Sequence, residues 1–401
     1  MNLSINNLLI FFPLFIISYF LRLGESSFYL FDLYFVVFVF FSASLIKRED
    51  FVRLLVINLI FIIVAFLGLI NSILSYNIDY LLDRFVAGVY RYCQFLYILG
   101  FFTFYLKTSD LKNNIYLKHL FLLSVSFPLF YSLFFYFFNP DKVIIFNRLS
   151  SYFGNPNFLG AFICLSIFPV IYTISLIKVR VQFLLYIFYF LVLFIFNLIY
   201  AGSNSYWMLS LIILILALIS MSKSLIGFAK IIFAFLFLGF WVYFVLGSIQ
   251  FDDELSGVNR TFKLLETISG GGDVNSLGSG ELRGNLAGEA IEFILTSVKN
   301  IFFGIGLGQS PIIIGANHGG FVTAHNAHIV LFMEMGAIGY FYFMFILFYF
   351  ILKIKISKIS LCFLISYLFA MLATPHVYMP FLWGIMVYGL FVYKINIIKE
   401  N

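Results

Sequence analysis

The chain of 401 residues is 63% hydrophobic and 21% aromatic, and only 10% of its residues are charged. A soluble domain is nearer half apolar and a quarter charged, so this chain lacks the polar surface to cover a globule in water. Its 24 basic residues outnumber its 18 acids but are scattered between apolar runs, which argues against a nucleic-acid partner. The composition therefore excludes an ordinary soluble enzyme and predicts an integral membrane protein.

Twelve apolar runs come close to the roughly 17–25 residues that cross a bilayer as a helix. In chain order they cover residues 7–24, 28–46, 51–71, 85–106, 117–138, 156–177, 181–200, 204–221, 225–248, 326–352, 359–374 and 379–394. The sequence thus predicts an all-α, polytopic fold. Nine spans fill residues 1–248, one large polar loop fills 249–325, and three spans with a C-terminal tail fill 326–401. The first run has no basic segment before it and no cleavage site after it, so it is expected to remain as a span.

Lysines and arginines predict which side each loop faces. Fifteen of the 24 fall in one alternating set of loops and nine in the other, although the second set contains the longest loop. By the positive-inside rule the first set is cytoplasmic, so both termini are inside and the large loop faces outward. The three cysteines lie far apart in apolar runs, which predicts neither a disulfide framework nor a zinc site.

The large loop carries most of the polar character of the chain, including a glycine run, and three of the five histidines lie in it or just after it. Within it, apolar residues recur at helical spacing with charged residues opposite. The apolar positions are Ala287, Ile291, Ile294, Val298 and Ile301. This pattern predicts one amphipathic helix on the outer membrane surface, ended by the glycines from Gly304 onward.

Arg148 precedes a Gly-Asn-Pro-Asn sequence in which Asn155 suits a helix N-cap and Pro156 the first turn. A capped helix start is one interpretation. The other is an anion site, because an arginine and a helix N-terminus both favour phosphate, with Asn155 and Asn157 beside it.

Two further arginines are candidates for the same surface. Arg283 comes before the predicted amphipathic helix, either as a solvated charge paired with Glu281 or as a donor to phosphate oxygens. Arg91, near the start of the fourth span, is a candidate for substrate binding at the same surface.

His325 and Asn326 stand where the tenth span begins. A histidine there is either a polar anchor or a group that accepts a proton or donates to a developing charge. His318, His325 and His328 do not have the spacing of a metal motif, so no metal is expected. Glu334 lies nine residues after His325 and is expected on the opposite helix face, outside the same site.

Taken together and in order, these motifs resemble the superfamily of O-antigen ligases and O-antigen polymerases, which are bacterial envelope glycosyltransferases. The resemblance covers roughly residues 145–345. It rests on Arg148 with Gly154–Asn157, the turn Gly202–Ser205, Arg283, the run Asn300–Gly306, and Ala324-His325-Asn326 followed by Glu334–Gly339. One departure is Asn204, where the family often has an arginine.

The resemblance implies an inverting glycosyl transfer at the periplasmic face of the bacterial inner membrane, with neither metal nor cofactor. The donor is a glycan on undecaprenyl diphosphate, held among membrane lipids. The acceptor is a sugar of another lipid-linked repeat unit for a polymerase, which we favour, or lipid A-core for a ligase. Arg283 and His325 are the expected catalytic residues, and Arg148, Asn155, Asn157, Asn326 and Arg91 the expected substrate-binding residues.

Two other functions stay open. A lipid-linked sugar flippase would need charges buried across several spans and short outer loops. A peptidoglycan polymerase of the shape-and-division family would use an outer aspartate such as Asp252, Asp253 or Asp273.

Overall fold

The computed structural model describes residues 30–76, 81–108, 115–145, 148–153, 155–202, 204–221, 270, 279–316, 318, 324–353, 358–372 and 385. Its helices are α3 (Leu30–Ser42), α4 (Arg48–Tyr76), α5 (Leu81–Thr108), α6 (Ile115–Phe138), α7 (Pro156–Ser175), α8 (Arg180–Ala201), α9 (Asn204–Met221), α12 (Ser279–Leu295), α13 (Val298–Phe303), α14 (Ser310–Ala316), α15 (Ala327–Lys353) and α16 (Lys358–Met371). The expected all-α fold is correct except for one short strand pair. Strand β1 (Ile144–Ile145) runs antiparallel to β2 (Arg148–Leu149), flanked by the 3-10 turns η1 (Pro140–Lys142) and η2 (Ser151–Phe153).

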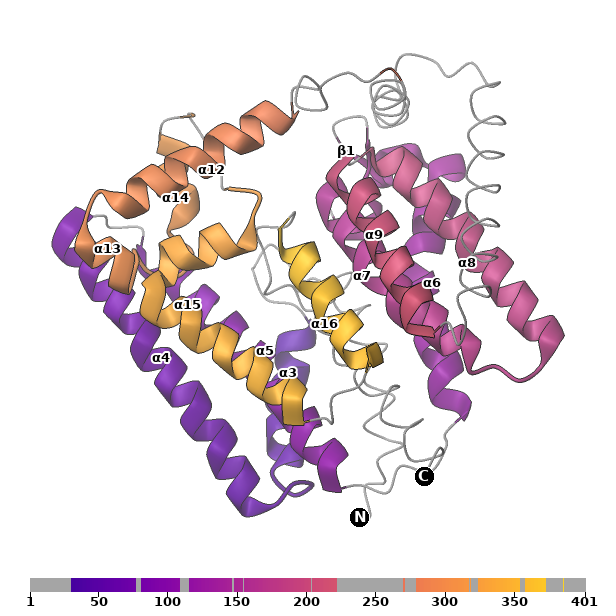
Figure 1. Ribbon diagram of the computed structural model, residues 1–401, viewed down its shortest axis with the longest axis horizontal. Helices are drawn as coiled ribbons and strands as arrows, with labels where there is room; N and C mark the ends of the chain where they lie inside the picture. The colour runs from indigo at the N-terminus through magenta and orange to yellow at the C-terminus, as the bar shows by residue number, and fades with distance from the viewer. Residues whose placement is uncertain are drawn as a thin grey trace.

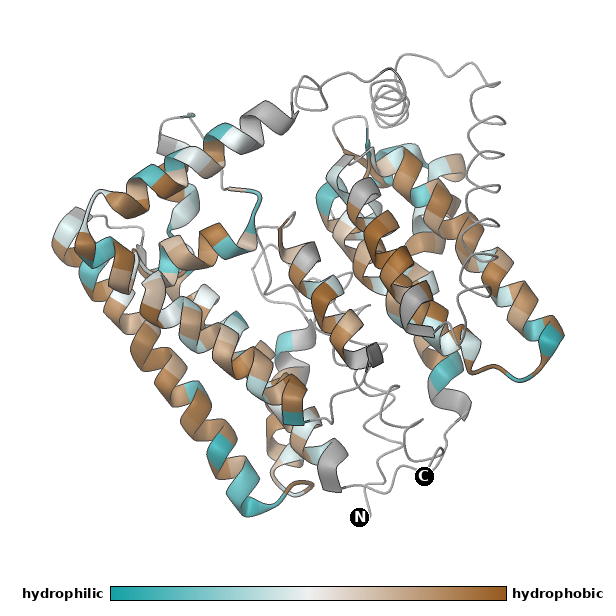
Figure 2. Ribbon diagram, in the orientation of Figure 1, coloured by the Kyte–Doolittle hydropathy of each residue, from teal (hydrophilic) through white to brown (hydrophobic). Residues whose placement is uncertain are grey.

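The chain is a helical membrane protein. In the described ranges, six helices are long and apolar enough to cross a bilayer, namely α4, α5, α6, α7, α8 and α15. Each overlaps a span predicted from the sequence. The shorter helices α3, α9 and α16 overlap three more. The predicted spans 7–24 and 225–248, and nearly all of 379–394, lie outside the described residues, so the total of twelve stays a prediction. Figure 2 shows apolar residues along most of the length of these helices and hydrophilic residues gathered near several helix ends.

The helices form two groups (Figure 1). Helices α3, α4, α5 and α15 pack together in one, and α6, α7, α8 and α9 in the other. Helix α16 lies between the groups, against α9 and α7 on one side and α15 on the other. The short helices α12, α13 and α14 cover one end of the first group, at the same end of the molecule as β1.

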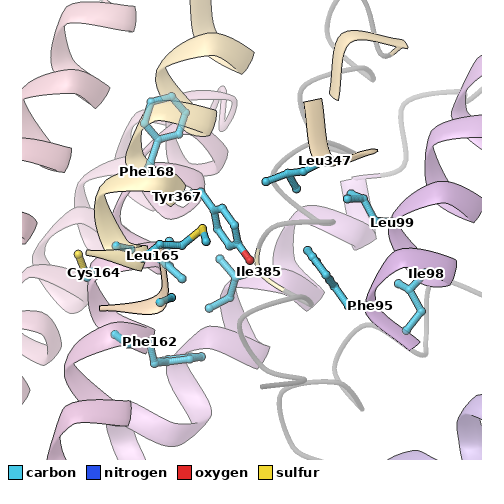
Figure 3. Close-up of a cluster of buried hydrophobic side chains, with 14 of the residues drawn as sticks. Phe95, Ile98, Leu99, Phe162, Cys164, Leu165, Phe168, Leu347, Tyr367 and Ile385 are labelled. Carbon is cyan, nitrogen blue, oxygen red and sulfur yellow. The ribbon is translucent and has the colours of Figure 1, made fainter. Parts of the chain in front are cut away.

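A buried apolar layer joins the two groups through α16. Tyr367 of α16 is 1% exposed and lies between side chains of α7, such as Phe162, and side chains of α5 and α15, such as Phe95 and Leu347 (Figure 3). Interiors of this kind are close-packed, so the position of α16 depends on both groups at once.

The predicted single amphipathic helix is two helices. Helix α12 ends at Leu295, and Ser297 caps α13 by accepting a hydrogen bond from the Lys299 amide at 3.2 Å. The break changes the helical register, so a single stripe cannot continue through it. The buried side of α12 consists of Leu286, Ala290 and Ile294, which pack on α14 and α15. Of the predicted apolar positions, Ile294 is buried in the protein, whereas Ile291 and Val298 are 46% and 69% exposed. The predicted contact of an apolar face with the membrane surface stays a prediction.

A glycine junction fixes α13 to α4 and α15. Helix α15 is interrupted at Gly336, which has φ +63°. Carbonyls that a helix break releases need other donors. The amides of Ile305 and Gly306 supply them, at 3.0 Å to Met333 O and 2.8 Å to Glu334 O. From α4, Asn71 Nδ2 donates to Gly304 O at 2.6 Å and to Asn300 Oδ1 at 3.0 Å.

Gly304 in this junction should tolerate no side chain. Its φ is +69°, and a Cβ would stand 2.5 Å from the Glu334 carbonyl. We expect Gly304→Ala to lower the free energy of unfolding by at least about 2 kcal/mol, because an alanine disfavours the positive φ and its Cβ would overlap the Glu334 carbonyl. Gly288 in α12 is the matched control, because nothing lies within 4 Å of its Cβ position. Gly288→Ala should stabilise by about 0.5–1 kcal/mol. Unfolding midpoints in detergent measure both, and equal midpoints for the two variants would contradict the packing described.

Candidate functional site

A cavity of about 330 Å³ lies where four separate segments meet. It is lined by Ser205 and Leu209 of α9, Gly284 and Ala287 of α12, His325 and Asn326 at the start of α15, and Leu372 after α16. Its polar groups are thus a hydroxyl, an imidazole and an amide, and the rest of its wall is apolar. Leu372 is itself 46% exposed, so apolar surface continues from the cavity wall to the outside of the bundle.

Two helix N-termini face this cavity. Ser205 belongs to the first turn of α9, and Asn326 directly precedes α15. The first amides of a helix lack partners within the helix and carry its positive dipole end. Two such ends at one cavity favour a negatively charged ligand.

Asn326 caps α15. Its Oδ1 accepts from the amides of His328 at 3.0 Å and Ile329 at 3.3 Å. Because the oxygen is used for the cap, the side chain can offer the cavity its NH2 group, which is a donor. His325, half-buried beside it, adds an imidazole that can donate or accept. The sequence-predicted pair His325 and Asn326 is therefore brought together on one wall.

Arg283 lies within α12, not before the helix as the sequence suggested. Its side chain is outside the described part of the structure. Its backbone position is next to Gly284 and one helical turn before Ala287, and both of those residues line the cavity. The segment of α12 that carries Arg283 thus forms one wall of the cavity, and His325 lines the same cavity.

Arg148 is held by the protein's own backbone. Its Nε donates to Ala201 O at 2.7 Å, in the last turn of α8, and one terminal nitrogen donates to Asn157 Oδ1 at 3.4 Å. Asn155 is the N-cap of α7, and its Oδ1 accepts from the Asn157 amide at 2.8 Å. The capped helix start is thereby confirmed. This group is not part of the cavity wall, but Ala201 is only four residues from Ser205, and the binding roles of Arg148, Asn155 and Asn157 stay predictions.

Arg91 is paired inside the bundle. It forms an ion pair with Asp32 of α3, with both terminal nitrogens on the carboxylate, and donates to Gln94 Oε1 at 2.9 Å. The side chains of Arg91 and Asp32 are only 12% and 5% exposed. Gln94 also donates to Asp32, at 2.9 Å. These bonds give Arg91 a structural role in joining α3 to α5, and its predicted role in substrate binding is untested.

Glu334 does not share the wall with His325. It is buried, and its Oε1 accepts from Ser310 Oγ at 2.7 Å and from the Ser310 amide at 3.2 Å. It therefore holds the start of α14 against α15, in agreement with the expectation that it lies outside the site.

The three histidines of the loop region have different surroundings. His318 Nε2 lies 3.0 Å from Glu289 Oε1 of α12, and His328 Nδ1 lies 3.0 Å from the Tyr340 hydroxyl. Within the described ranges, no three His, Cys, Asp or Glu side chains are placed to hold a metal ion. The candidate aspartates Asp252, Asp253 and Asp273 are outside those ranges.

Sequence reasoning missed Ser205, Leu209, Ala287 and Leu372 as wall residues. Ser205 belongs to a recognised motif, the turn Gly202–Ser205, but its place in one cavity wall with His325 depends on packing between distant helices. The comparisons with known proteins give no family: no family model matches the chain, and no curated protein matches it significantly.

The ion pair yields a prediction. Arg91→Ala would leave the Asp32 carboxylate buried without its cation, at a cost of about 3–5 kcal/mol. The double variant Asp32→Asn, Arg91→Gln should recover much of that loss, because no uncompensated charge remains. A double-mutant cycle of unfolding midpoints measures the coupling. If the two single losses simply add, the pair does not have the structural role described.

Proposed function

We propose that this protein is a membrane glycosyltransferase that moves a glycan from a polyprenyl diphosphate carrier to a sugar hydroxyl. The more specific proposal is an O-antigen polymerase, with another lipid-linked repeat unit as acceptor. The observation that supports it best is the cavity where the N-termini of α9 and α15 face one space, with His325 and Asn326 on its wall and the Arg283 segment beside them.

The reaction needs what such a cavity offers. The acceptor oxygen forms a bond to the anomeric carbon, and the bond from that carbon to the phosphate oxygen breaks with its electron pair on the diphosphate. The hydroxyl proton passes to a base or to the departing phosphate. Negative charge grows on the diphosphate, so donors already in place stabilise the transition state more than the bound substrate.

The roles of individual residues follow from this chemistry. The NH2 group of Asn326 would donate to diphosphate oxygens, and the positive dipole ends of α9 and α15 would favour their negative charge. Arg283 would add a cation with a planar set of donors. His325 would accept the hydroxyl proton or donate to phosphate; either role needs only its place on the cavity wall.

The apolar part of the cavity suits a lipid-linked donor. Leu209 and Leu372 lie on its wall, and Leu211 and Ile212 of α9 are 51% and 37% exposed. A carrier chain can stay in the bilayer while its diphosphate enters the cavity. Because the leaving group is already activated, no nucleotide is needed, which agrees with the proposed site at the periplasmic face of a bacterial inner membrane.

Removal of either proposed catalytic side chain should stop glycan extension. Loss of one preorganised donor typically costs about 10²–10³ in rate, or about 3–4 kcal/mol. We expect the glycan-transfer rate of Arg283→Ala and of His325→Ala to fall by that factor, as measured by glycan ladders. Immunoblots should show unchanged abundance of both variants in the membrane. Arg53→Ala is the control. The Arg53 side chain is 56% exposed and lies near the start of α4, whereas Asn71, near the other end of α4, contacts the glycine junction. EDTA should leave activity intact.

Full activity in both the Arg283→Ala and the His325→Ala variant would refute the assignment of these residues as catalytic. Loss of activity on replacing Asp252, Asp253 or Asp273 would favour a peptidoglycan polymerase.

A deletion strain separates polymerase from ligase. If the chain is a polymerase, its loss should leave a single repeat unit on lipid A-core, because ligation continues without extension. If it is a ligase, lipid A-core should be bare and polymer should stay on its carrier. Gel analysis of lipopolysaccharide distinguishes the two patterns. Unchanged surface glycan would contradict both.

A further inference from the structure

His328 connects α15 and α16, beside which two parts of the cavity wall lie. Its ring lies in the first turn of α15, three residues after His325. Its Nδ1 is 3.0 Å from the hydroxyl of Tyr340, and its Nε2 is 3.4 Å from the carbonyl oxygen of Leu368 in α16. The ring also meets the Tyr340 ring edge-on, with centroids 6.1 Å apart.

The direction of these hydrogen bonds follows from the partners. A carbonyl oxygen only accepts, so Nε2 carries the proton that points to Leu368. In the neutral ring Nδ1 then accepts from the Tyr340 hydroxyl. Every polar atom of the imidazole is used by the protein itself, so His328 is not available as a proton acceptor for substrate.

Both ends of this link are places where a helix needs support. Leu368 is in the last turn of α16 as described, where carbonyls lack partners within their own helix. Tyr340 lies beyond the interruption at Gly336, so its bond to His328 joins the two halves of α15. The link therefore fixes the first turn of α15 both to the rest of that helix and to α16.

The link ends close to the cavity on both sides. Asn326, whose Oδ1 caps the His328 amide, is on one wall, and Leu372, one turn after Leu368, is on another. Any shift of α16 relative to α15 changes the separation of these two walls.

We propose that His328 is a positioning residue that sets the width of the cavity by holding the end of α16 against α15. The effect on width is a property of the fold, and the effect on catalysis rests on the proposed function.

Cysteine cross-linking measures the width without any assay of activity. In a chain with Cys93, Cys164 and Cys362 replaced by alanine, Ala287→Cys and Leu372→Cys place thiols on two cavity walls. Bifunctional thiol reagents of increasing length then report the separation. We expect that in His328→Leu the most efficient cross-linking reagent is a longer one, or that reagents over a broader range of lengths react. His328→Gln, which keeps a donor and an acceptor, should restore the original preference.

His119 provides a matched control. Its Nδ1 lies 2.9 Å from the Tyr186 hydroxyl, an equivalent histidine–tyrosine pair between α6 and α8 away from the cavity wall. His119→Leu should leave the reagent preference unchanged. If His328→Leu folds and keeps the original preference, or if His119→Leu alters it equally, the inference is overturned.

Kinetics then test the catalytic consequence. A displacement of about 1 Å at a reacting group can cost on the order of 10²-fold in rate. We expect His328→Leu to lower kcat/KM for glycan transfer about 10- to 100-fold and His328→Gln to recover most of it. A changed width in a protein with no transferase activity would support the positioning role and refute the proposed function. An unchanged width with lost activity would refute the positioning role alone.

Discussion

The hydrogen bonds from Ile305 and Gly306 to the carbonyls of Met333 and Glu334 are the constraint on which the candidate site depends. They join the segment that follows α13 to α15 just before its interruption at Gly336. Helix α12 reaches this junction through α13, and the first turn of α15 reaches it directly. The wall made by Gly284 and Ala287 and the wall made by His325 and Asn326 are therefore held in register by one set of backbone contacts. Because Ile305, Met333 and Glu334 are buried in the protein, breaking these bonds would leave polar backbone groups without water or another partner, which is costly.

The electrostatic character of the cavity comes from the backbone as much as from side chains. Helices α9 and α15 begin there, and both direct the positive end of the helix dipole toward it. Arginines contribute less directly than the sequence suggested. Arg91 neutralises Asp32, and Arg148 donates to the end of α8 and to Asn157. Arg91 and Arg148 thus hold helices together, and the role of Arg283 beside the cavity belongs to the proposed function.

Local features of the fold could be predicted from the sequence, because they depend on short stretches of chain. The apolar runs identify helices such as α4 and α15, and Asn155 with Pro156 identifies the start of α7. The break at Ser297 was missed because the apolar spacing continues through it, although the local serine is a good cap. The pairing of Asp32 with Arg91, and the presence of Ser205 and His325 in the wall of one cavity, could not be predicted, because each depends on packing between segments far apart in the chain. Only the order of the motifs suggested that they act together.

The exposed apolar side chains of α12 and α13 affect how the protein must be handled outside its membrane. Leu286, Ala290 and Ile294 pack on neighbouring helices, yet Leu295, Val298 and Phe302 are 65%, 69% and 49% exposed on the same two short helices. Exposed apolar surface of this kind aggregates unless something amphiphilic covers it. A solubilising micelle that encloses only the long spans would leave these side chains in water. Purification in nanodiscs, or in a mild detergent that forms large micelles, suits this architecture better than purification in a short-chain detergent.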